Sequence, residues 1–202
     1  DRWVQEGFAG YAEELAVESF YGRKAAEEFF HDRTRFGGDS VTANVKPLIS
    51  EYNISKDGGD DMYFQGWALI HMIRAIVGDD VKFRKMLRGI SAEFYHQTVT
   101  SAQIEHYISW VTGRDFSRLF DQYLRTVGLP VMEYRLKGNV LSYRLTHCVP
   151  GLALPLKTNW TGDNWLNTTT DWQSVSLPTG GVTGNLRIDY DFYLSASLVS
   201  SS

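Results

Sequence analysis

A glutamate stands between small residues near the start of the sequence, in the stretch WVQEGFAGYAEEL at positions 3–15. Each glycine inside a helix costs about 1 kcal/mol relative to alanine, so Gly7 and Gly10 predict that a neighbouring segment comes close to this helix. A carboxylate beside residues without side chains, here Glu6, can be approached by another helix or by a metal ion. The same spacing fits a solvated glutamate on a helix with a packing glycine, because charged residues usually sit in water.

A tyrosine begins the most apolar helix that the sequence predicts. The stretch MYFQGWALIHMIRAIVGDD, at positions 62–80, is apolar on nearly all sides, which is typical of a buried helix. The phenol of a tyrosine has an ordinary pKa of about 10, so Tyr63 stays protonated at neutral pH and can donate a hydrogen bond to an oxyanion. The alternative is a tyrosine that only packs in the core.

The other ionisable residues have structural interpretations. His71 lies on the same apolar helix, where a lone histidine is more often a hydrogen-bonded core residue than a metal ligand. Glu13 and Glu14 are expected on a solvated face, although Glu13 shares the side of Glu6 and could support it. Cys148 is expected to be inert at a strand end. No metal-ligand spacing joins the remaining histidines, which are His31, His96, His106 and His147.

The elements that must position these residues are helices up to Pro130. In the first helix Val4, Phe8, Tyr11 and Leu15 form one apolar stripe. A short polar helix is predicted over positions 23–33. A long polar connection follows over positions 36–61, and we expect it to frame a site. Capping residues are predicted at several helix ends. They are Asp79 or Asp80, Thr100 with Gln103, Gly113, Asp115, Gly128 and Pro130.

The apolar residues alternate with polar ones after Pro130. VMEYRL and VLSYRL flank the turn signal KGN, which predicts a hairpin with Met132, Tyr134 and Leu136 on one face. Leu141, Tyr143 and Leu145 are the expected partners across that hairpin. Further short strands predict a small antiparallel β-sandwich. The sequence therefore predicts an α+β chain with a helical domain over residues 1–129 and a β-sandwich domain over residues 130–202.

Composition excludes some function classes. The net charge of -4 and the pI of about 5.7 show no basic excess, so nucleic acid is not an expected partner. No apolar run approaches the ~20 residues that a membrane span needs. The single cysteine leaves the compartment undetermined, and the short sandwich gives only a lean toward the bacterial periplasm or cell envelope.

Four stretches resemble one enzyme family. WVQEGFAGYAEEL is similar to the W-x-x-E-G-F-A-x-Y pattern of gluzincin aminopeptidases, the family of aminopeptidase N and leukotriene hydrolase. YFQGWALIHMIRAIVGDDVKFRKML is similar to the family's Y-x-K-G helix and the helix after it. VTGRDFSRLFDQYLRTVGLPVMEYRL resembles the passage from helical lobe to β-sandwich, and DYDFY at positions 189–193 resembles its closing strand. The matches run through nearly the whole chain in the family's order.

This resemblance implies a thermolysin-like metallopeptidase lobe that binds one zinc ion and hydrolyses the N-terminal residue of peptides. Glu6 corresponds to the third zinc ligand, and Tyr63 to the tyrosine that stabilises the oxyanion when zinc-bound water attacks the scissile carbonyl. The other two ligands and the general base come from an H-E-x-x-H motif, which this sequence does not contain. Gln65 replaces the family's lysine, which is expected to change the charge around Tyr63.

We therefore expect the chain to be a fragment whose partners are peptide substrates and the missing N-terminal part of the same protein. Alone, it is expected to be inactive and to hold zinc weakly or not at all. Two alternatives remain. One is a catalytically inactive scaffold of the same architecture, and the other is a helical and β-sandwich interaction module in which Glu6 and Tyr63 only pack.

Overall fold

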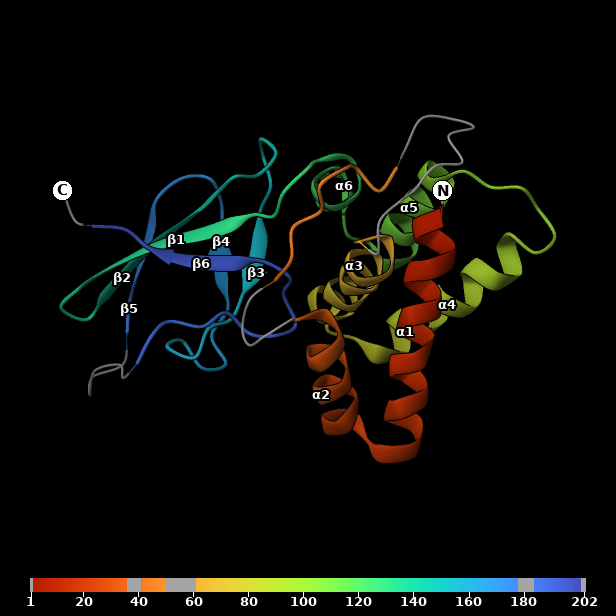
Figure 1. The fold of residues 1–202 in the computed structure, drawn as a ribbon, viewed down its shortest axis with the longest axis horizontal. Coiled ribbons are helices and arrows are strands. Elements are labelled where there is room, and N and C mark those ends of the chain that lie inside the picture. Colours follow the sequence, from red (N-terminus) through yellow and green to blue (C-terminus); the bar gives the residue numbers. More distant parts are fainter. Residues whose placement is uncertain (1, 36–40, 50–60, 178–183, 201–202) are drawn as a thin grey trace.

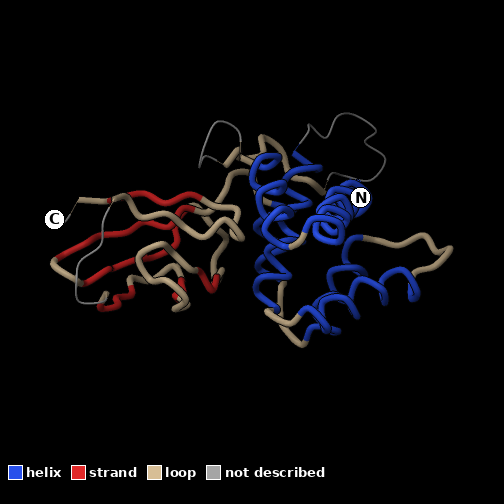
Figure 2. Tube along the Cα trace, turned by 90° about the horizontal axis from the view of Figure 1, so that it is seen from below, coloured by secondary structure: helices blue, strands red, loops and turns tan. Residues whose placement is uncertain are grey.

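The computed structural model describes residues 2–35, 41–49, 61–177 and 184–200 and has mixed helix and sheet, as an α+β chain requires. Helices come first and form one end of the molecule, and strands follow and form the other (Figures 1 and 2). The helices are α1 (Arg2–Tyr21), α2 (Arg23–Thr34), α3 (Asp61–Val77), α4 (Asp80–Glu93), α5 (Ser101–Thr112) and α6 (Ser117–Phe120), followed by the π-helix η1 (Asp121–Arg125). The division into domains at residues 129 and 130 stays a prediction.

The strands form two small sheets. They are β1 (Val131–Lys137), β2 (Val140–Thr146), β3 (Leu154–Leu156), β4 (Leu166–Thr168), β5 (Gln173–Ser176) and β6 (Ser195–Leu198). The first sheet has the order β5-β2-β1-β6, and the second pairs β3 with β4. Alternation along β1 and β2 places apolar side chains on one face, where they join the core.

The predicted hairpin is confirmed in its register. Met132 lies opposite Leu145, and Tyr134 lies opposite Tyr143, on either side of a turn that has Gly138 at a positive φ of 60°. The expectation of a wholly antiparallel sandwich is wrong at one edge, because β6 pairs with β1 in parallel. Alternation predicts which face of a strand is buried, but it does not predict the strand's neighbour.

Helices α1 and α3 run in parallel and touch at their glycines. A Cβ built on Gly7 would lie 2.8 Å from the backbone carbon of Gly66, and one built on Gly10 would lie 3.1 Å from the Trp67 ring. Contacts continue in the same order along both helices, from Gly7 and Gly66 to Glu18 and Arg74. The close neighbour that the two glycines of α1 predict is therefore α3.

The buried face of α1 differs from the predicted stripe. Its buried residues are Trp3, Gly7, Tyr11 and Glu14. Of the predicted stripe, Tyr11 is buried, whereas Val4, Phe8 and Leu15 are half-buried at the edge of the core. The stripe is shifted because the axis of contact is set by the glycines, which a hydrophobicity pattern does not count.

Most predicted helix caps are confirmed. Asp79 accepts a hydrogen bond from the Lys82 backbone at 2.9 Å, and Thr100 with Gln103 forms the capping box. Gly113 ends α5 in the left-handed conformation. The N-cap of α6 is Phe116, so the cap predicted at Asp115 is wrong by one residue, although Asp115 accepts from the Ser117 backbone at 2.8 Å.

The helix predicted from Asp115 to Gly128 is instead one α-helical turn followed by the π-helix η1. The helix ends at Arg125, so its last carbonyl oxygens have no partner within the helix, and side chains or loops from elsewhere bond to them. The Tyr123 carbonyl accepts from the Gln65 side chain at 2.7 Å, and the Leu124 carbonyl accepts from the Ile49 backbone at 3.0 Å. Of the long connection predicted over positions 36–61, residues 41–49 are described and the rest lies outside the described residues, apart from the first residue of α3.

The segment before β6 joins the strands to the helices. The Tyr123 hydroxyl donates to the Tyr193 carbonyl at 2.8 Å, and the Arg35 guanidinium donates to the Phe192 carbonyl at 2.9 Å. DYDFY, which resembles a closing strand, contains a turn here. Asp191 bonds to His71 of α3, and the Asp189 backbone N–H donates to the Lys157 carbonyl at 2.9 Å, just after β3. Strand β6 begins two residues after DYDFY.

Within the described part of the chain, no helix combines the length and the apolar character that crossing a membrane requires.

The glycine contact predicts the effect of adding one methyl group. We expect Gly7→Ala to lower the free energy of unfolding by about 1–3 kcal/mol, because the new Cβ meets backbone that cannot move aside. Helix propensity alone would give the opposite sign, with a gain of about 1 kcal/mol. Urea denaturation measures the difference. The control is Ala12→Leu on the exposed side of α1, which should change stability by less than about 0.5 kcal/mol.

Candidate functional site

Glu6 lies on α1 immediately before the glycine contact. Its side chain is half-buried, and no hydrogen bond or ion pair to another described residue engages its carboxylate. Carboxylates that are partly removed from water usually have a partner. The Glu6 carboxylate is therefore available to a ligand from outside the described residues.

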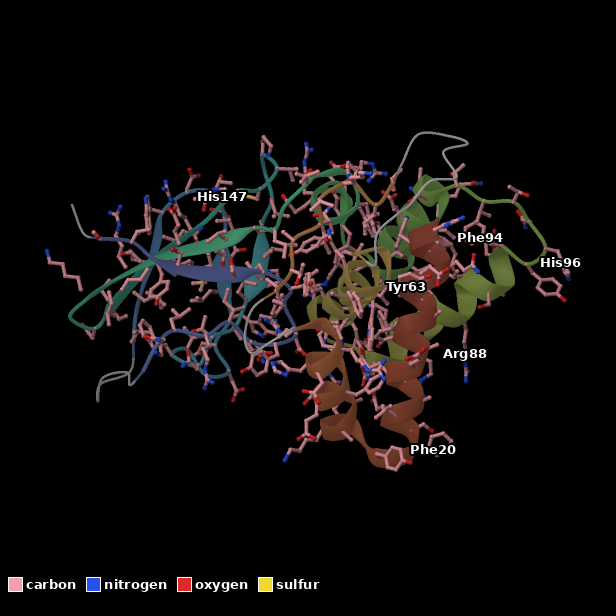
Figure 3. All side chains as sticks on the ribbon, viewed as in Figure 1. Phe20, Tyr63, Arg88, Phe94, His96 and His147 are labelled. Carbon is pink, nitrogen blue, oxygen red and sulfur yellow. The ribbon has the colours of Figure 1, made fainter. Side chains whose placement is uncertain are left out.

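Tyr63 lies in the first turn of α3, next to α1 (Figure 3). Its side chain is 42% exposed, whereas the residues that follow it on α3 are nearly all buried. The alternative of a tyrosine that only packs in the core does not describe this position. The phenol is accessible at the end of an otherwise buried helix.

Helix geometry places Glu6 and Tyr63 on the same side of the helix pair. Gly7 and Gly66 face each other across the contact. Glu6 is one residue before Gly7, which is a rotation of about 100° about the axis of α1. Tyr63 is three residues before Gly66, which is a rotation of about 300° about the axis of α3, in the same sense because the helices are parallel. Both rotations end on the same side of the plane that contains the two helix axes. The two side chains therefore project from neighbouring helix ends toward the same region.

A series of hydrogen bonds between side chains holds the N-terminal end of α1. The Trp3 indole donates to the Ser101 hydroxyl at 2.8 Å, and that hydroxyl donates to Glu105 at 2.6 Å. Glu105 also accepts from Arg125 of η1 at 2.8 Å. Trp3 is one turn before Glu6, so these bonds fix the turn of α1 that carries the carboxylate.

Gln65 points away from Tyr63. Its side chain is 1% exposed and donates to the Tyr123 carbonyl, while its own amide oxygen has no hydrogen-bond partner among the described residues. The expectation that Gln65 changes the charge around Tyr63 presumes a side chain in the site. The structure instead shows a neutral amide inside the protein, where a lysine would bury a charge.

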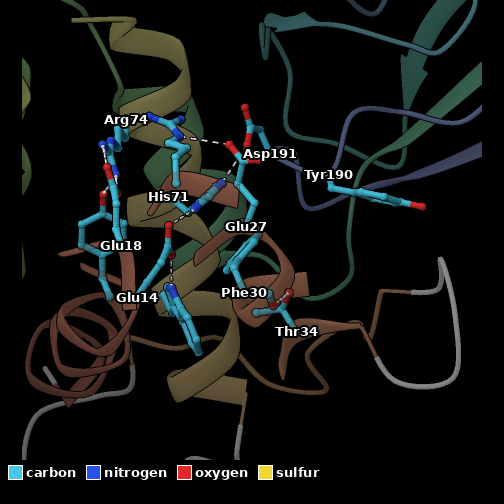
Figure 4. A network of polar contacts seen from close by, with 12 residues as sticks. Glu14, Glu18, Glu27, Phe30, Thr34, His71, Arg74, Tyr190 and Asp191 are labelled. Atoms are coloured by element: carbon cyan, nitrogen blue, oxygen red, sulfur yellow. Dashed lines mark hydrogen bonds and ion pairs between the residues drawn. The ribbon is translucent and has the colours of Figure 1, made fainter. Parts of the chain in front are cut away.

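A buried polar cluster lies farther along the same helix pair (Figure 4). The Glu14 carboxylate accepts from the Trp67 indole at 2.6 Å and bonds to His71 Nδ1 at 2.8 Å. His71 Nε2 bonds to Asp191 at 2.9 Å, and the Phe30 ring stacks on the imidazole at 3.9 Å. The interpretation of His71 as a hydrogen-bonded core residue is confirmed. The solvated face expected for Glu14 is wrong, because the side chain is 2% exposed and fully bonded.

The two carboxylates keep His71 charged. Burial opposes the charge, but the hydrogen bonds to Asp191 and Glu14 outweigh it and raise the pKa of His71 to about 9. Burial also opposes the charge of Asp191 and by itself raises the pKa of that carboxyl. The hydrogen bond to His71 more than offsets this, so the pKa of Asp191 is lowered overall. A protonated imidazole between two carboxylates therefore links α1, α3 and the segment before β6.

One turn further along, Arg74 links three side chains. It donates to Glu18 at 2.6 Å, to Asp80 at 2.8 Å and to the Tyr11 hydroxyl at 3.2 Å. The hydrogen bonds from Arg74 lower the pKa of both the Glu18 and the Asp80 carboxyl groups. Burial raises the pKa of Tyr11, so its phenol stays neutral.

Sequence reasoning missed Glu14 and Asp191. The signal for Glu14 was present, since it follows Gly7 by seven residues and Tyr11 by three, which is the spacing of one helix face. No comparable signal marks Asp191, whose partner lies 120 positions away. Glu13 is exposed, so the proposed support of Glu6 by Glu13 has no contact behind it. Burial raises the pKa of the Cys148 thiol, as an unreactive cysteine requires.

Among the described residues, no group of three or more histidine, cysteine, aspartate or glutamate side chains converges as a metal centre requires. A metal ion at Glu6 therefore needs ligands from elsewhere.

The charge of His71 predicts how stability depends on pH. The folded pKa of about 9 lies above the unfolded value of 6.5, so the stabilisation is complete below pH 6.5 and is lost as the pH rises through 9. The free energy of unfolding is expected to fall by about 3 kcal/mol over this pH range. Urea denaturation at pH 6.5 and 9.5 should show this fall, and Asp191→Asn should reduce it. His106→Gln, at an exposed position, is the control, and equal stability at both pH values would contradict the assignment.

Comparison with known proteins now adds to this geometry. Three relatives align with the chain: aminopeptidase N of Lactococcus lactis subsp. lactis (24% identical, 88% of this chain, 22% of the relative), probable aminopeptidase 1 of Sulfurisphaera tokodaii (23%, 71% and 19%), and aminopeptidase M1-C of Oryza sativa subsp. japonica (22%, 69% and 16%). The chain thus spans about a fifth of the length of the curated relatives it matches.

The family model described as the peptidase family M1 domain matches residues 1–123, which include α1, α3 and both candidate residues. The match covers more than half of the chain and stops within η1, before the first strand. The chain belongs to peptidase family M1.

Proposed function

We propose that this chain is part of a zinc-dependent aminopeptidase and that it supplies Glu6 as a metal ligand and Tyr63 as a hydrogen-bond donor to the substrate. The observation that carries the proposal is the backbone contact between Gly7 and Gly66, from which helix geometry puts Glu6 and Tyr63 on one side of the helix pair. Family membership and the aminopeptidase names of the relatives support the same reaction class.

The residues present fit one part of such a centre. The Glu6 carboxylate has no partner within the described residues and is half-buried, which suits a ligand that contributes one oxygen donor to zinc. Zinc at this position would act as a Lewis acid on the scissile carbonyl and make water nucleophilic near neutral pH. The remaining ligands and the general base would come from an H-E-x-x-H motif outside this sequence, as in the thermolysin-like lobe that the family implies.

Tyr63 has a separate role in this proposal. Its hydroxyl donates a hydrogen bond to the oxygen that gains negative charge when the scissile carbonyl becomes tetrahedral. Because Tyr63 is exposed at the end of a buried helix, its ring is held by α3 while its hydroxyl faces the substrate side. Peptides with a free amino terminus are the proposed substrates.

The role of Glu6 is tested in the full-length gene product. We expect Glu6→Ala to lose bound zinc, measured by elemental analysis after dialysis, and to lose hydrolysis of aminoacyl-arylamides with it. Glu13→Ala, at an exposed position on the same helix, is the control and should keep both. Zinc content equal to the wild type in Glu6→Ala would contradict the assignment of the ligand.

The role of Tyr63 predicts a different pattern. We expect Tyr63→Phe to keep its zinc and its KM but to lower kcat by about 100- to 1000-fold, because one donor to the oxyanion is removed. Tyr95→Phe, at another exposed tyrosine, is the matched control and should leave kcat unchanged. A kcat within twofold of the wild type in Tyr63→Phe would remove Tyr63 from the mechanism.

The 202-residue chain alone gives a third test. We expect it to hydrolyse no aminoacyl-arylamide and to bind zinc much more weakly than the full-length protein, because it supplies a single carboxylate ligand. Zinc titration and an activity assay measure both properties. Full-length protein that also lacks activity while holding zinc would favour the inactive scaffold.

A further inference from the structure

We propose that Glu14 is a positioning residue for this site. Its buried carboxylate fixes α1 against α3 and so holds Glu6 and Tyr63 in the relative positions that catalysis needs. The inference rests on the proposed function, because it concerns the two residues that the function assigns. It goes beyond that function, since Glu14 touches neither of them.

The glycine contact alone does not fix how the two helices are turned. Gly7 and Gly66 meet backbone to backbone, so the contact lets the helices approach but has no side chain that interlocks. Helices that meet at small residues can slide or rotate until side chains elsewhere stop them. The orientation of Glu6 relative to Tyr63 therefore depends on directional bonds farther along the pair.

Glu14 supplies such bonds at the middle of the pair. Its two oxygens bond to Trp67 and His71, which lie on successive turns of α3, at 2.6 and 2.8 Å. One carboxylate that spans two turns resists both sliding and rotation of α1 on α3. Because Glu14 is buried, water cannot replace either bond without cost.

The partners of Glu14 are themselves fixed. The Trp67 ring packs between Phe29 and Phe30 of α2, with ring centroids 5.6 and 5.5 Å apart. His71 is held on its far side by Asp191 and is covered by Phe30. Glu14 therefore bonds to groups that cannot follow α1 if it moves.

The distance from Glu14 to the site makes the arrangement sensitive. Glu6 precedes Glu14 by eight residues, or about 12 Å along α1, and Tyr63 precedes His71 by eight residues on α3. A small tilt or rotation at Glu14 is carried to Glu6 because a helix is stiff over this length. A displacement of about 1 Å at reacting groups can cost about 100-fold in rate.

The first test compares neighbouring glutamates in the full-length protein. We expect Glu14→Ala to lower kcat by about 10- to 100-fold while KM and zinc content stay at wild-type values, because ligand and donor remain but lose their alignment. Glu13→Ala, at the next position and exposed, should leave kcat unchanged. A kcat within twofold of the wild type in Glu14→Ala would overturn the inference.

The conservative variant Glu14→Gln gives a readout that loss of stability does not produce. The amide oxygen can accept from Trp67 while the amide nitrogen donates to His71 Nδ1, but only when the imidazole is neutral. The charged groups around His71 are Glu14 and Asp191, with Arg23 and Lys157 acting on Asp191. We therefore expect Glu14→Gln to match the wild-type kcat at high pH and, as the pH falls, to lose kcat at a higher pH than the wild type does.

The outcomes separate this inference from the proposed function. If Glu14→Ala does not fold, Glu14→Gln decides, since an acid limb displaced to higher pH in that variant supports the inference and an acid limb at the wild-type pH overturns it. Loss of zinc and kcat together in both variants at every pH would show that Glu14 only stabilises the fold, and would also overturn it. If Glu6→Ala and Tyr63→Phe behave as proposed while Glu14→Ala is fully active, only the positioning role fails.

Discussion

The close contact between Gly7 and Gly66 determines the rest of the helical structure. Two parallel helices can approach this closely only where neither has a side chain, and the contact then sets which residues of α1 face α3. It brings Trp67 and His71 within reach of Glu14, and it turns Glu6 and Tyr63 toward one region. The loss of helix propensity at the glycines is thus offset by the contacts that their small size permits.

Charged side chains form a row along this helix pair, which is buried at Glu14, His71 and Arg74 and exposed at Asp80. Glu14, His71 and Asp191 form its first part, and Glu18, Arg74 and Asp80 form its second. Every one of these groups has a partner of opposite charge, which is the condition for keeping charges out of water. Because a broken buried pair leaves an uncompensated charge, this row favours one relative placement of α1 and α3 over all others.

The sequence predicted the features that depend on local patterns. The β1–β2 register followed from alternation about Gly138, and the capping box followed from Thr100 and Gln103. It did not predict η1, because a change from α to π hydrogen bonding leaves no mark in composition. The parallel pairing of β6 and the contact of Asp191 with His71 depend on residues far apart in the chain, which periodicity does not report.

The candidate site also contains residues that local sequence patterns predict and residues that they do not. The neighbours of Glu6 and Tyr63 match family motifs, and Gly7 gives a physical reason for a close neighbouring helix. Glu14 is expected in solvent because charged residues usually lie there, although its spacing from Gly7 and Tyr11 places it on the buried face. A spacing rule that ignores residue chemistry would have assigned this position correctly.

The parallel partnership of β1 and β6 has a consequence for the order of folding. The residues that pair, Val131 with Ser195 onward, are separated by more than sixty positions, so closing this sheet edge costs more loop entropy than closing the β1–β2 hairpin. The residues of the helix pair leave the ribosome before Asp191 does. His71 therefore gains its second carboxylate only after translation has passed that point.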